Sequence, residues 1–558
     1  MSSMLKAVFA AVSLGLVFSS PSLSAQAANN GSAENPQWNL MLTGSELQIC
    51  SSMNSDYCNS TSWIEANEMR TARLFQLTDV RRREALRQAI WPRARSGVRE
   101  ELDVALREMV DYFGRGVVPE YRFVERLRSR AYLELIMRLS EAEYERVLDN
   151  LEMPRLEGLD EVVNLAENKD NSGEFIAEFV QMAERIKGSK PTILVVTAGE
   201  RDSFRAVDSH VQAFQQAGAN ARWLPLDIAV TQAQLNEACG ELEPLRRELS
   251  GNYDRDRVNP SRHAEQLAFC NNESAAAELL ASADGVFFTG GSANRLRNTL
   301  LPTGEPISAL QALRSRFNEG KLAVGGAGEG AQALVSANMI TNGHSREAMS
   351  VGSRAAAAPP VGCDFDNSCP RGLNPNSLTY EPLGGVGVFR AGIVDTDVGQ
   401  RGREVRMLRV AADTNTPLAM GIDRDTAVFM NSRNGVFAVR GSNSVFFVES
   451  AQGTESMIAA TFHYLRNGSM GRLAGSRVAS VVMAQQPEFF PESTTNRFLG
   501  DTGIADNVDV ACRGPKQLRL LQERYVLMMQ TTENSELELS RGRCQIFNGV
   551  MGVAIQEP

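Results

Sequence analysis

The sequence has little that would support binding to nucleic acid, a membrane or a metal ion. Its 57 Lys and Arg are outnumbered by 67 Asp and Glu, a formal net charge of −10, whereas a phosphate backbone requires a basic surface. Beyond the N-terminus no apolar run is long enough to cross a bilayer. No Cys-x-x-Cys pair is present, and no cluster of His lies beside the cysteines. These absences exclude nucleic acid as a general partner and predict no membrane span, no metal and no cofactor.

The N-terminus has the pattern of an export signal. Lys6 gives the positive region, Ala7–Phe18 is an apolar core too short for a membrane span, and Ala25-Gln26-Ala27 offers a small-x-small cleavage site. We therefore expect residues 1–27 to be a signal peptide and the mature protein to be periplasmic or secreted.

The cysteines agree with export. An even number of cysteines in an exported chain favours disulfides over zinc, although connectivity does not follow from sequence. Proximity along the chain suggests four pairs: Cys50–Cys58, Cys239–Cys270, Cys363–Cys369 and Cys512–Cys544.

The order of the predicted elements divides the mature chain into three regions. Residues 28–188 are mainly helical after an irregular stretch at 29–67; Arg and Glu are interleaved there, which is typical of solvated helix faces. In residues 189–474 short apolar strands alternate with helices, which predicts an α/β fold with a mostly parallel, doubly wound sheet. Residues 475–558 form a disulfide-tied extension. We also predict helices over Ile458–Arg466 and Lys516–Gln530.

An elbow-like turn stands out within the α/β region. The apolar run Leu322–Val324 ends in small residues and leads into a helix start at Gln332. Strand, tight turn and helix form the elbow on which many α/β enzymes present a nucleophile. In the frame small-x-nucleophile-x-small, the nucleophile position is Gly328, which has no side chain.

Five stretches of residues 190–473 resemble, in order, the cyanophycinase-type serine peptidases, which have a class I glutamine amidotransferase-like fold. Two of these matches are specific: Val394–Arg403 is similar to the family's Asp-Gln-His-Phe-x-Gln-Arg-Gly-Arg block, and Gly421–Ala427 to its Gly-Ile-Asp-Glu-x-Thr-Ala segment. The other three are the strand ending in Thr197–Glu200, the glycine turn Phe287–Gly291 and the elbow Gly325–Ala331.

The residues that carry the family's chemistry are replaced in this chain. The resemblance places the nucleophilic Ser at Gly328, the catalytic His at Asp397 and the acidic residue at Arg424. The polar pair after the glycine turn is Ser292-Ala293, so the family's substrate-contacting Gln is also missing. A serine hydrolase needs a nucleophile, a base and a group that orients the base, and none of the three remains.

The frame around the lost triad is kept, which implies a binding site. We expect an exported, non-catalytic homologue that binds a peptide-like or small basic ligand, with a homodimer left open. The candidate ligand-binding residues are Gly290, Gly291, Ser292, Glu329, Asp395, Gln400, Arg401 and Arg403. Gln400, Arg401 and Arg403 could instead only support the sheet.

Two other functions use the same residues. Glu200, Glu329, Asp395 and Asp397 could converge as carboxylates that share a proton or hold a cation, which would leave a hydrolase active by other means. Gly326-x-Gly328-x-x-Ala331 with Glu347 fits a dinucleotide fingerprint, although that motif usually opens the first βαβ unit.

Overall fold

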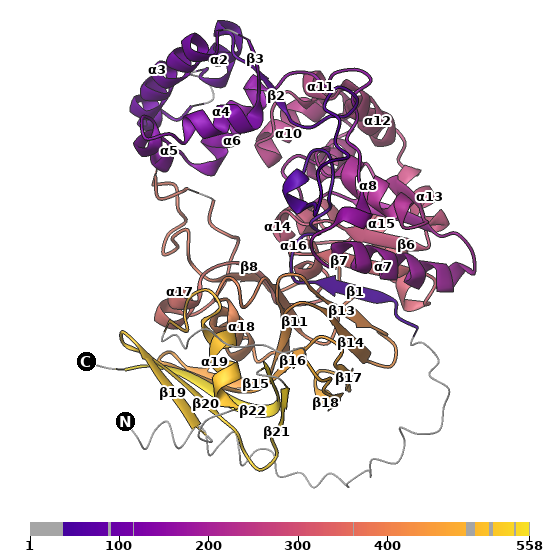
Figure 1. Cartoon of the computed structure of the whole chain (residues 1–558), viewed down its shortest axis with the longest axis vertical. Coiled ribbons are helices and arrows are strands. Elements are labelled where there is room, and N and C mark those ends of the chain that lie inside the picture. The colour runs from indigo at the N-terminus through magenta and orange to yellow at the C-terminus, as the bar shows by residue number, and fades with distance from the viewer. Residues whose placement is uncertain are drawn as a thin grey trace.

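The protein has a mixed α/β architecture built around two large sheets (Figure 1). The computed structural model describes residues 37–87, 91–114, 116–360, 362–365, 367–486, 497–512, 517–540 and 543–556. The predicted signal peptide lies outside these residues. Within the described part of the chain, no helix combines the length and the apolar character that crossing a membrane requires.

The first sheet has nine strands, and only half of it is parallel. Its order is β18-β17-β14-β13-β1-β7-β6-β4-β5. The strands from β1 to β5 pair in parallel and the strands from β13 to β18 are antiparallel. The predicted α/β class is therefore correct. The predicted parallel arrangement applies only to the half of the sheet from β1 to β5. The strands are β1 (Leu40–Thr43), β4 (Thr192–Val196), β5 (Asn220–Trp223), β6 (Gly285–Phe288), β7 (Ala323–Ala327), β13 (Thr426–Met430), β14 (Val436–Gly441), β17 (Met470–Leu473) and β18 (Val478–Val482).

Strand β1 lies in the centre of this sheet, in a stretch that we predicted to be irregular. It pairs in parallel with β7 and antiparallel with β13. Leu40 and Leu42 pack into one apolar cluster and Met41 into the cluster on the opposite face, as the alternation of side chains along a strand requires. The prediction was wrong because a four-residue strand with three apolar residues gives little periodic signal.

Helices cover both faces of the parallel half. One face packs against α7 (Ser172–Lys187) and α8 (Val207–Gln216). The other packs against residues of α9 (Ile228–Leu235), α14 (Ala293–Leu300) and α15 (Ser308–Asn318), and against part of the second sheet. The remaining helices of this region are α10 (Leu242–Ser250), α11 (Arg255–Val258), α12 (Pro260–Cys270), α13 (Ala275–Ser282) and α16 (Glu329–Gln332).

The second sheet is almost wholly antiparallel and joins two distant parts of the chain. Its order is β11-β12-β15-β16-β22-β20-β19, with β21 beside β22; only β11 and β12 are parallel. It packs against α17 (Ser345–Val351), α18 (Glu404–Asp413) and α19 (Gly503–Ala511). Its strands are β11 (Ile393–Thr396), β12 (Leu418–Ile422), β15 (Ser444–Thr454), β16 (Met457–Arg466), β19 (Gln517–Gln522), β20 (Tyr525–Gln530), β21 (Glu536–Ser540) and β22 (Arg543–Ile555). A small sheet, β8 (Met339–Asn342), β10 (Thr379–Glu381) and β9 (Arg354–Ala355), lies nearby.

Two predicted helices are strands of this sheet. Residues 457–466 form β16, which pairs with β15 and β22. The segment predicted as helix 516–530 contains the hairpin of β19 and β20, which turns at Glu523 with φ 54°. Both segments are rich in aromatic and aliphatic residues, and for such runs periodicity alone does not separate a buried helix from a strand. Pairing with strands far along the chain determines that both segments are strands.

The helices near the N-terminus form a unit with its own apolar cluster, whose members run from Phe75 to Leu151. This helical unit contains the small pair β2 (Leu74–Gln76) and β3 (Val117–Pro119), and it lies at one end of the molecule (Figure 1). A capping box at Ser140 and Glu143 begins its last helix. Its helices are α2 (Asp79–Ala85), α3 (Ser96–Phe113), α4 (Glu120–Leu127), α5 (Leu133–Arg138) and α6 (Glu141–Leu151).

All four cysteine pairs suggested by proximity are disulfides in the structure: Cys50–Cys58, Cys239–Cys270, Cys363–Cys369 and Cys512–Cys544. The loop of the third bridge reaches the helical unit, where the Arg95 guanidinium lies 5.5 Å from the ring centre of Phe365. The disulfides are consistent with an extracellular protein.

Candidate functional site

The turn between β7 and α16 has the backbone of a nucleophile elbow. Gly328 has φ 53° and ψ −127°, a combination outside the regions that L-residues populate. Its neighbours must be small: a Cβ on Gly330 would lie 2.2 Å from the Thr289 carbonyl oxygen, and one on Gly326 would lie 2.8 Å from Cα of Ala331. The elbow is thus present in shape, and the residue at its tip has no side chain.

Residues 44–46, which follow β1, cover this elbow. The N–H of Gly328 donates to the Thr43 carbonyl at 3.2 Å, and the N–H of Asp397 donates to the Gly44 carbonyl at 2.6 Å. A Cβ at position 328 would lie 3.1 Å from the backbone nitrogen of Glu46. The chain itself therefore occupies the space in front of the elbow.

The side chain of Glu46 is seated in the glycine turn after β6. Its Oε1 accepts the N–H of Gly291 at 2.9 Å, and a Cβ on Gly290 would lie 2.2 Å from its side chain. Only glycine at position 290 allows this approach. The turn that the sequence suggested as part of a binding site thus already holds a carboxylate group of the same chain.

A cavity of about 630 Å³ opens at this point. Its wall includes Gly290, Gly291, Gly328, Glu329, Asp397, Arg401 and Arg424 among the residues chosen from sequence, with Glu200 from the carboxylate alternative. Sequence reasoning missed the other main contributors: Gly44 to Ile49, Asn54, Tyr57, Arg205 and His210. The short apolar run 40–42 followed by Thr-Gly-Ser was the available signal for a strand and a turn here.

Two glutamates in the cavity wall, Glu46 and Glu200, have raised pKa values. Burial raises the pKa of Glu200 to about 8, and the nearby charge of Glu46 adds to the shift. Burial also raises the pKa of Glu46, against a lowering effect of the Gly291 N–H. The Glu200 Oε1 accepts a hydrogen bond from the Thr289 hydroxyl at 3.1 Å. At neutral pH the pair holds a proton.

Asp397 and Arg424, the positions to which the resemblance assigns the catalytic His and the acidic residue, form an ion pair. Both oxygens of Asp397 accept from Arg424, at 3.1 and 3.0 Å, and Asp397 adopts φ 56°. Arg401 lies 3.6 Å from Asp397 and 3.8 Å from Glu329. The Gln400 side chain does not line the cavity and accepts the backbone N–H of Arg424 at 2.8 Å. These residues make a charged rim with both signs.

Three other candidates have structural contacts outside the cavity. Asp395 is fully buried and receives both Arg406 nitrogens, at 2.8 and 2.6 Å. Arg403 donates to the Thr396 carbonyl, and burial together with Arg406 lowers its pKa to about 10. The Ser292 hydroxyl accepts the N–H of Arg295 as the cap of α14. The structure therefore separates these three from the residues that face the cavity.

His210 is the histidine that reaches the cavity wall, although its position in the sequence suggested a packing role. Its Nδ1 lies 2.9 Å from the Ala206 carbonyl oxygen, and burial lowers its pKa to about 4. A neutral imidazole could accept a proton, but no nucleophilic side chain exists at position 328 to supply one. Among the described residues no group of three or more His, Cys, Asp or Glu is arranged to hold a metal ion.

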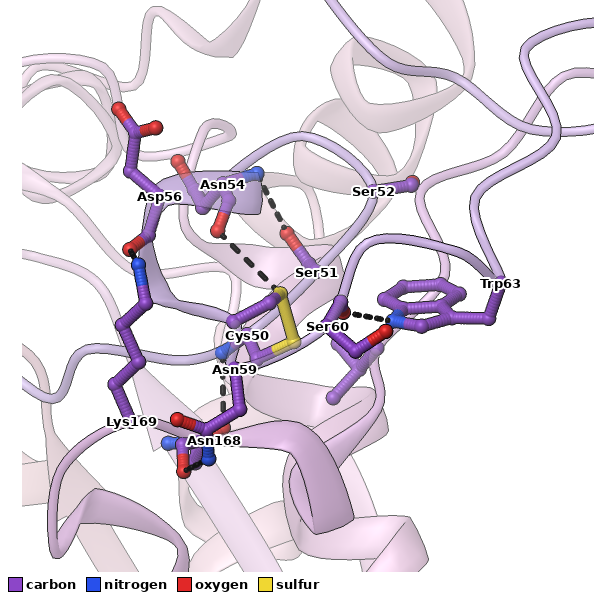
Figure 2. The surroundings of a disulfide bond; sticks show 12 residues. Cys50, Ser51, Ser52, Asn54, Asp56, Asn59, Ser60, Trp63, Asn168 and Lys169 are labelled. Carbon is purple, nitrogen blue, oxygen red and sulfur yellow. Dashed lines mark hydrogen bonds between the residues drawn. A yellow bond between two sulfur atoms is a disulfide. The ribbon is translucent and has the colours of Figure 1, made fainter.

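A second cavity, of about 560 Å³, adjoins the first. It lies between the helical unit and the α/β region, and it shares Asn54, Tyr57 and Arg205 with the first cavity. The disulfide loop 50–58 provides two of these residues. Figure 2 shows how the loop is held: Asn59 binds Asn168, and Lys169 donates to the carbonyl of Asp56 at 2.6 Å.

The dinucleotide alternative fits the structure poorly. Helix α16 has four residues, so it lacks the long helix on whose N-terminus a pyrophosphate rests. Glu347 lies in the first turn of α17, beside the three-stranded sheet, and does not line either cavity.

Comparison with known proteins does not show a family for this chain. No protein-family model matches it. Among solved structures, it is similar to the crystal structure of a peptidase from an acI-B1 Actinobacterium, with 17% sequence identity and a TM-score of 0.31 over 54% of this chain and 91% of that chain. A likeness at this level assigns neither the fold nor the activity of the present protein.

Proposed function

We propose that this protein is an exported, cyanophycinase-like homologue of the serine peptidases that binds a peptide-like ligand without hydrolysing it. The observation that carries the proposal is the elbow at Gly328: its backbone conformation is that of a nucleophile turn, and it has no side chain and is covered by residues 44–46. Without an Oγ there is no group to attack a carbonyl carbon. The ion pair of Asp397 with Arg424 replaces the base and the acid.

The charges of the cavity favour a ligand with both signs. Glu329 and Asp397 line one cavity together with Arg205, Arg401 and Arg424, so a peptide with its amine and carboxylate matches the wall better than a purely basic ligand does. We extend the proposal to the organisation of the chain: a signal peptide at 1–27, a helical region at 28–188, a class I glutamine amidotransferase-like domain at 189–474 and a disulfide-tied extension at 475–558.

The test is hydrolysis and binding by the purified mature protein with a panel of β-aspartyl and ordinary dipeptides. We expect no hydrolysis by the wild type, and a rise in melting temperature with at least one dipeptide, since a ligand that binds only the folded state stabilises it. Glu46→Ala should strengthen that binding because it vacates the Gly290–Gly291 turn. Arg346→Gln, a substitution of an exposed arginine that lines neither cavity, is the control. Cleavage by the wild type would overturn the proposal.

A carboxyl-based hydrolase is the second candidate, and the observation in its favour is the glutamate pair. Glu46 and Glu200 line one cavity, and the pKa of Glu200 is raised to about 8; in other enzymes two carboxyl groups with different protonation states activate water. If the wild type cleaves a dipeptide and Glu200→Gln abolishes cleavage with unchanged melting temperature, this candidate replaces the first. If Gly328→Ser is as inert as the wild type, the loss of the base is sufficient by itself to prevent serine chemistry.

A further inference from the structure

Three polar residues, Asn54, Tyr57 and Arg205, line both cavities. The side chains of Asn54 and Arg205 and the hydroxyl of Tyr57 make no hydrogen bond or ion pair with any described residue. All three are exposed. Arg205 lies near the carboxylates of Glu46 and Glu200 but not within ion-pair distance of either. Other arginines around this cavity are paired: Arg73 with Glu120, and Arg255 with Glu152 and Asp202.

In the cavity between the helical unit and the α/β region, three arginines share one glutamate. The single carboxylate of Glu152 lies 3.0 Å from Arg255, 3.5 Å from Arg73 and 3.8 Å from Arg70. Arg70 has no other ion pair among the described residues, and burial and the neighbouring Arg155 lower its pKa. Crowding of like charges in a partly closed space is relieved when an anion enters it.

Two further acidic residues line this wall, Glu161 and the exposed Asp56. Burial raises the pKa of Glu161, and its Oε1 accepts a hydrogen bond from the Ser51 hydroxyl. Ser51 belongs to the same disulfide loop as Asn54 and Tyr57. The pKa shift of Glu161 favours its neutral form.

The backbone that carries Asn54 and Tyr57 is held in place before any ligand arrives. The Cys50–Cys58 bridge closes the loop, the N–H of Cys50 donates to Asn168 at 2.9 Å, and Asn168 donates to the Gln48 carbonyl at 2.7 Å. The N–H of Lys169 donates to the Tyr57 carbonyl at 3.0 Å. Preorganised donors lower the entropy cost of binding, which is what a recognition site requires.

We propose that Arg205, with Arg70, Asn54 and Tyr57, forms an anion-binding site for a carboxylate or phosphate group at the junction of the two cavities. The guanidinium of Arg205 supplies the charge and a planar fork of donors suited to either oxyanion. Tyr57 and Asn54 supply donors from the disulfide loop, and Arg70 adds a guanidinium from the wall of the second cavity. The site shares Arg205 with the cavity of the proposed function, and its test uses simple anions, so its outcome does not require peptide binding.

The test is calorimetric titration of the mature protein with glutarate and, separately, with inorganic phosphate at low ionic strength. We expect at least one probe to bind, and Arg205→Gln to weaken its binding tenfold or more. Asn54→Asp, which keeps the shape of the side chain and adds a negative charge, should weaken it as well. Arg107→Gln removes the same charge from an exposed arginine of the helical unit and should leave binding unchanged.

The possible outcomes distinguish a carboxylate ligand from a phosphate ligand, and they decide whether the proposal holds. Binding of glutarate alone assigns the site to carboxylates, and binding of phosphate alone assigns it to phosphoryl groups. Because the chain has a net charge of −10, non-specific attraction of anions is unfavourable, and binding of either probe reports a local site. The proposal is overturned if neither probe binds at millimolar concentration, or if Arg205→Gln and Asn54→Asp both bind as Arg107→Gln does. Unchanged circular dichroism and melting temperature show that both variants fold.

Discussion

At the scale of single residues, glycine at position 328 allows a backbone that other residues resist. We predict that Gly328→Ala lowers the free energy of unfolding by about 1–3 kcal/mol, because φ is positive and the new Cβ meets the backbone of Glu46 at 3.1 Å. Gly304→Ala is the matched control: φ is +86° and no atom lies within 4 Å of its Cβ, so it should cost roughly 1 kcal/mol. If urea denaturation gives the same loss of unfolding free energy for both variants, residues 45–46 do not crowd the elbow.

The buried glutamate pair makes stability depend on pH. Glu200 has a pKa of about 8 in the folded protein and near 4.3 when unfolded. Between these values the folded state holds the proton that the unfolded state has lost, so stability falls as pH rises. The loss is roughly 1.4 kcal/mol for each unit of the shift.

Glu200→Gln removes this dependence. We predict that the melting temperature of the variant minus that of the wild type increases from pH 5 to pH 8. The amide stays neutral over this range, whereas Glu200 of the wild type loses its proton. Differential scanning fluorimetry at the two pH values measures the difference, and other buried acids cancel in the comparison. If the melting temperatures of wild type and variant change in parallel with pH, the pKa of Glu200 is not raised.

At the scale of elements, the disulfide loop 50–58 fixes one wall of both cavities. We predict that replacing Cys50 and Cys58 together by Ala costs about 2–3 kcal/mol, the loop-closure entropy for a sequence separation of 8. Probe binding at Arg205 should weaken too, since Asn54 and Tyr57 lose their fixed positions. Replacing Cys363 and Cys369, with a separation of 6, is the control: it should cost similar stability and leave binding unchanged, as measured by urea denaturation and titration calorimetry.

At the scale of the whole molecule, ion pairs join the helical unit to the α/β region. Arg255 of α11 contacts Glu152, at the end of α6, and Asp202, at 3.0 and 2.8 Å. Arg201 contacts Asp149 and Glu145 of α6 at 2.6 and 2.8 Å. These groups are mostly buried, so removing one partner leaves an uncompensated charge in a medium of low polarity.

We predict that Arg255→Met costs about 3–5 kcal/mol and separates the unfolding of the helical unit from that of the α/β region. Two transitions in scanning calorimetry, where the wild type shows one, would be the signature. The control Arg107→Met breaks an exposed pair with Asp103 and should cost well under 1 kcal/mol. If the two variants lose the same stability, the ionic contact does not couple the two units.

The sequence alone determined the features that depend on neighbouring residues. Close cysteines gave the four disulfides, continuous apolar runs gave the buried strands β4, β6 and β7, and small residues around Gly328 gave the elbow, because each signal lies within about thirty residues of chain. The sequence failed where distant segments meet. Strand β1 is set by pairing with strands almost 300 and 400 positions away, and β16 and β20 are strands because β22 lies beside them.

Only the tertiary structure decided what the site contains. Glu46 meets Gly291 across a separation of 245 residues, and Arg205 and Tyr57 both line the junction of two cavities. No local pattern encodes either arrangement, since both follow from the insertion of β1 into the sheet and from the docking of the disulfide loop. The sequence determined that the elbow lacks a nucleophile; the fold decided that the chain's own residues fill the space in front of it.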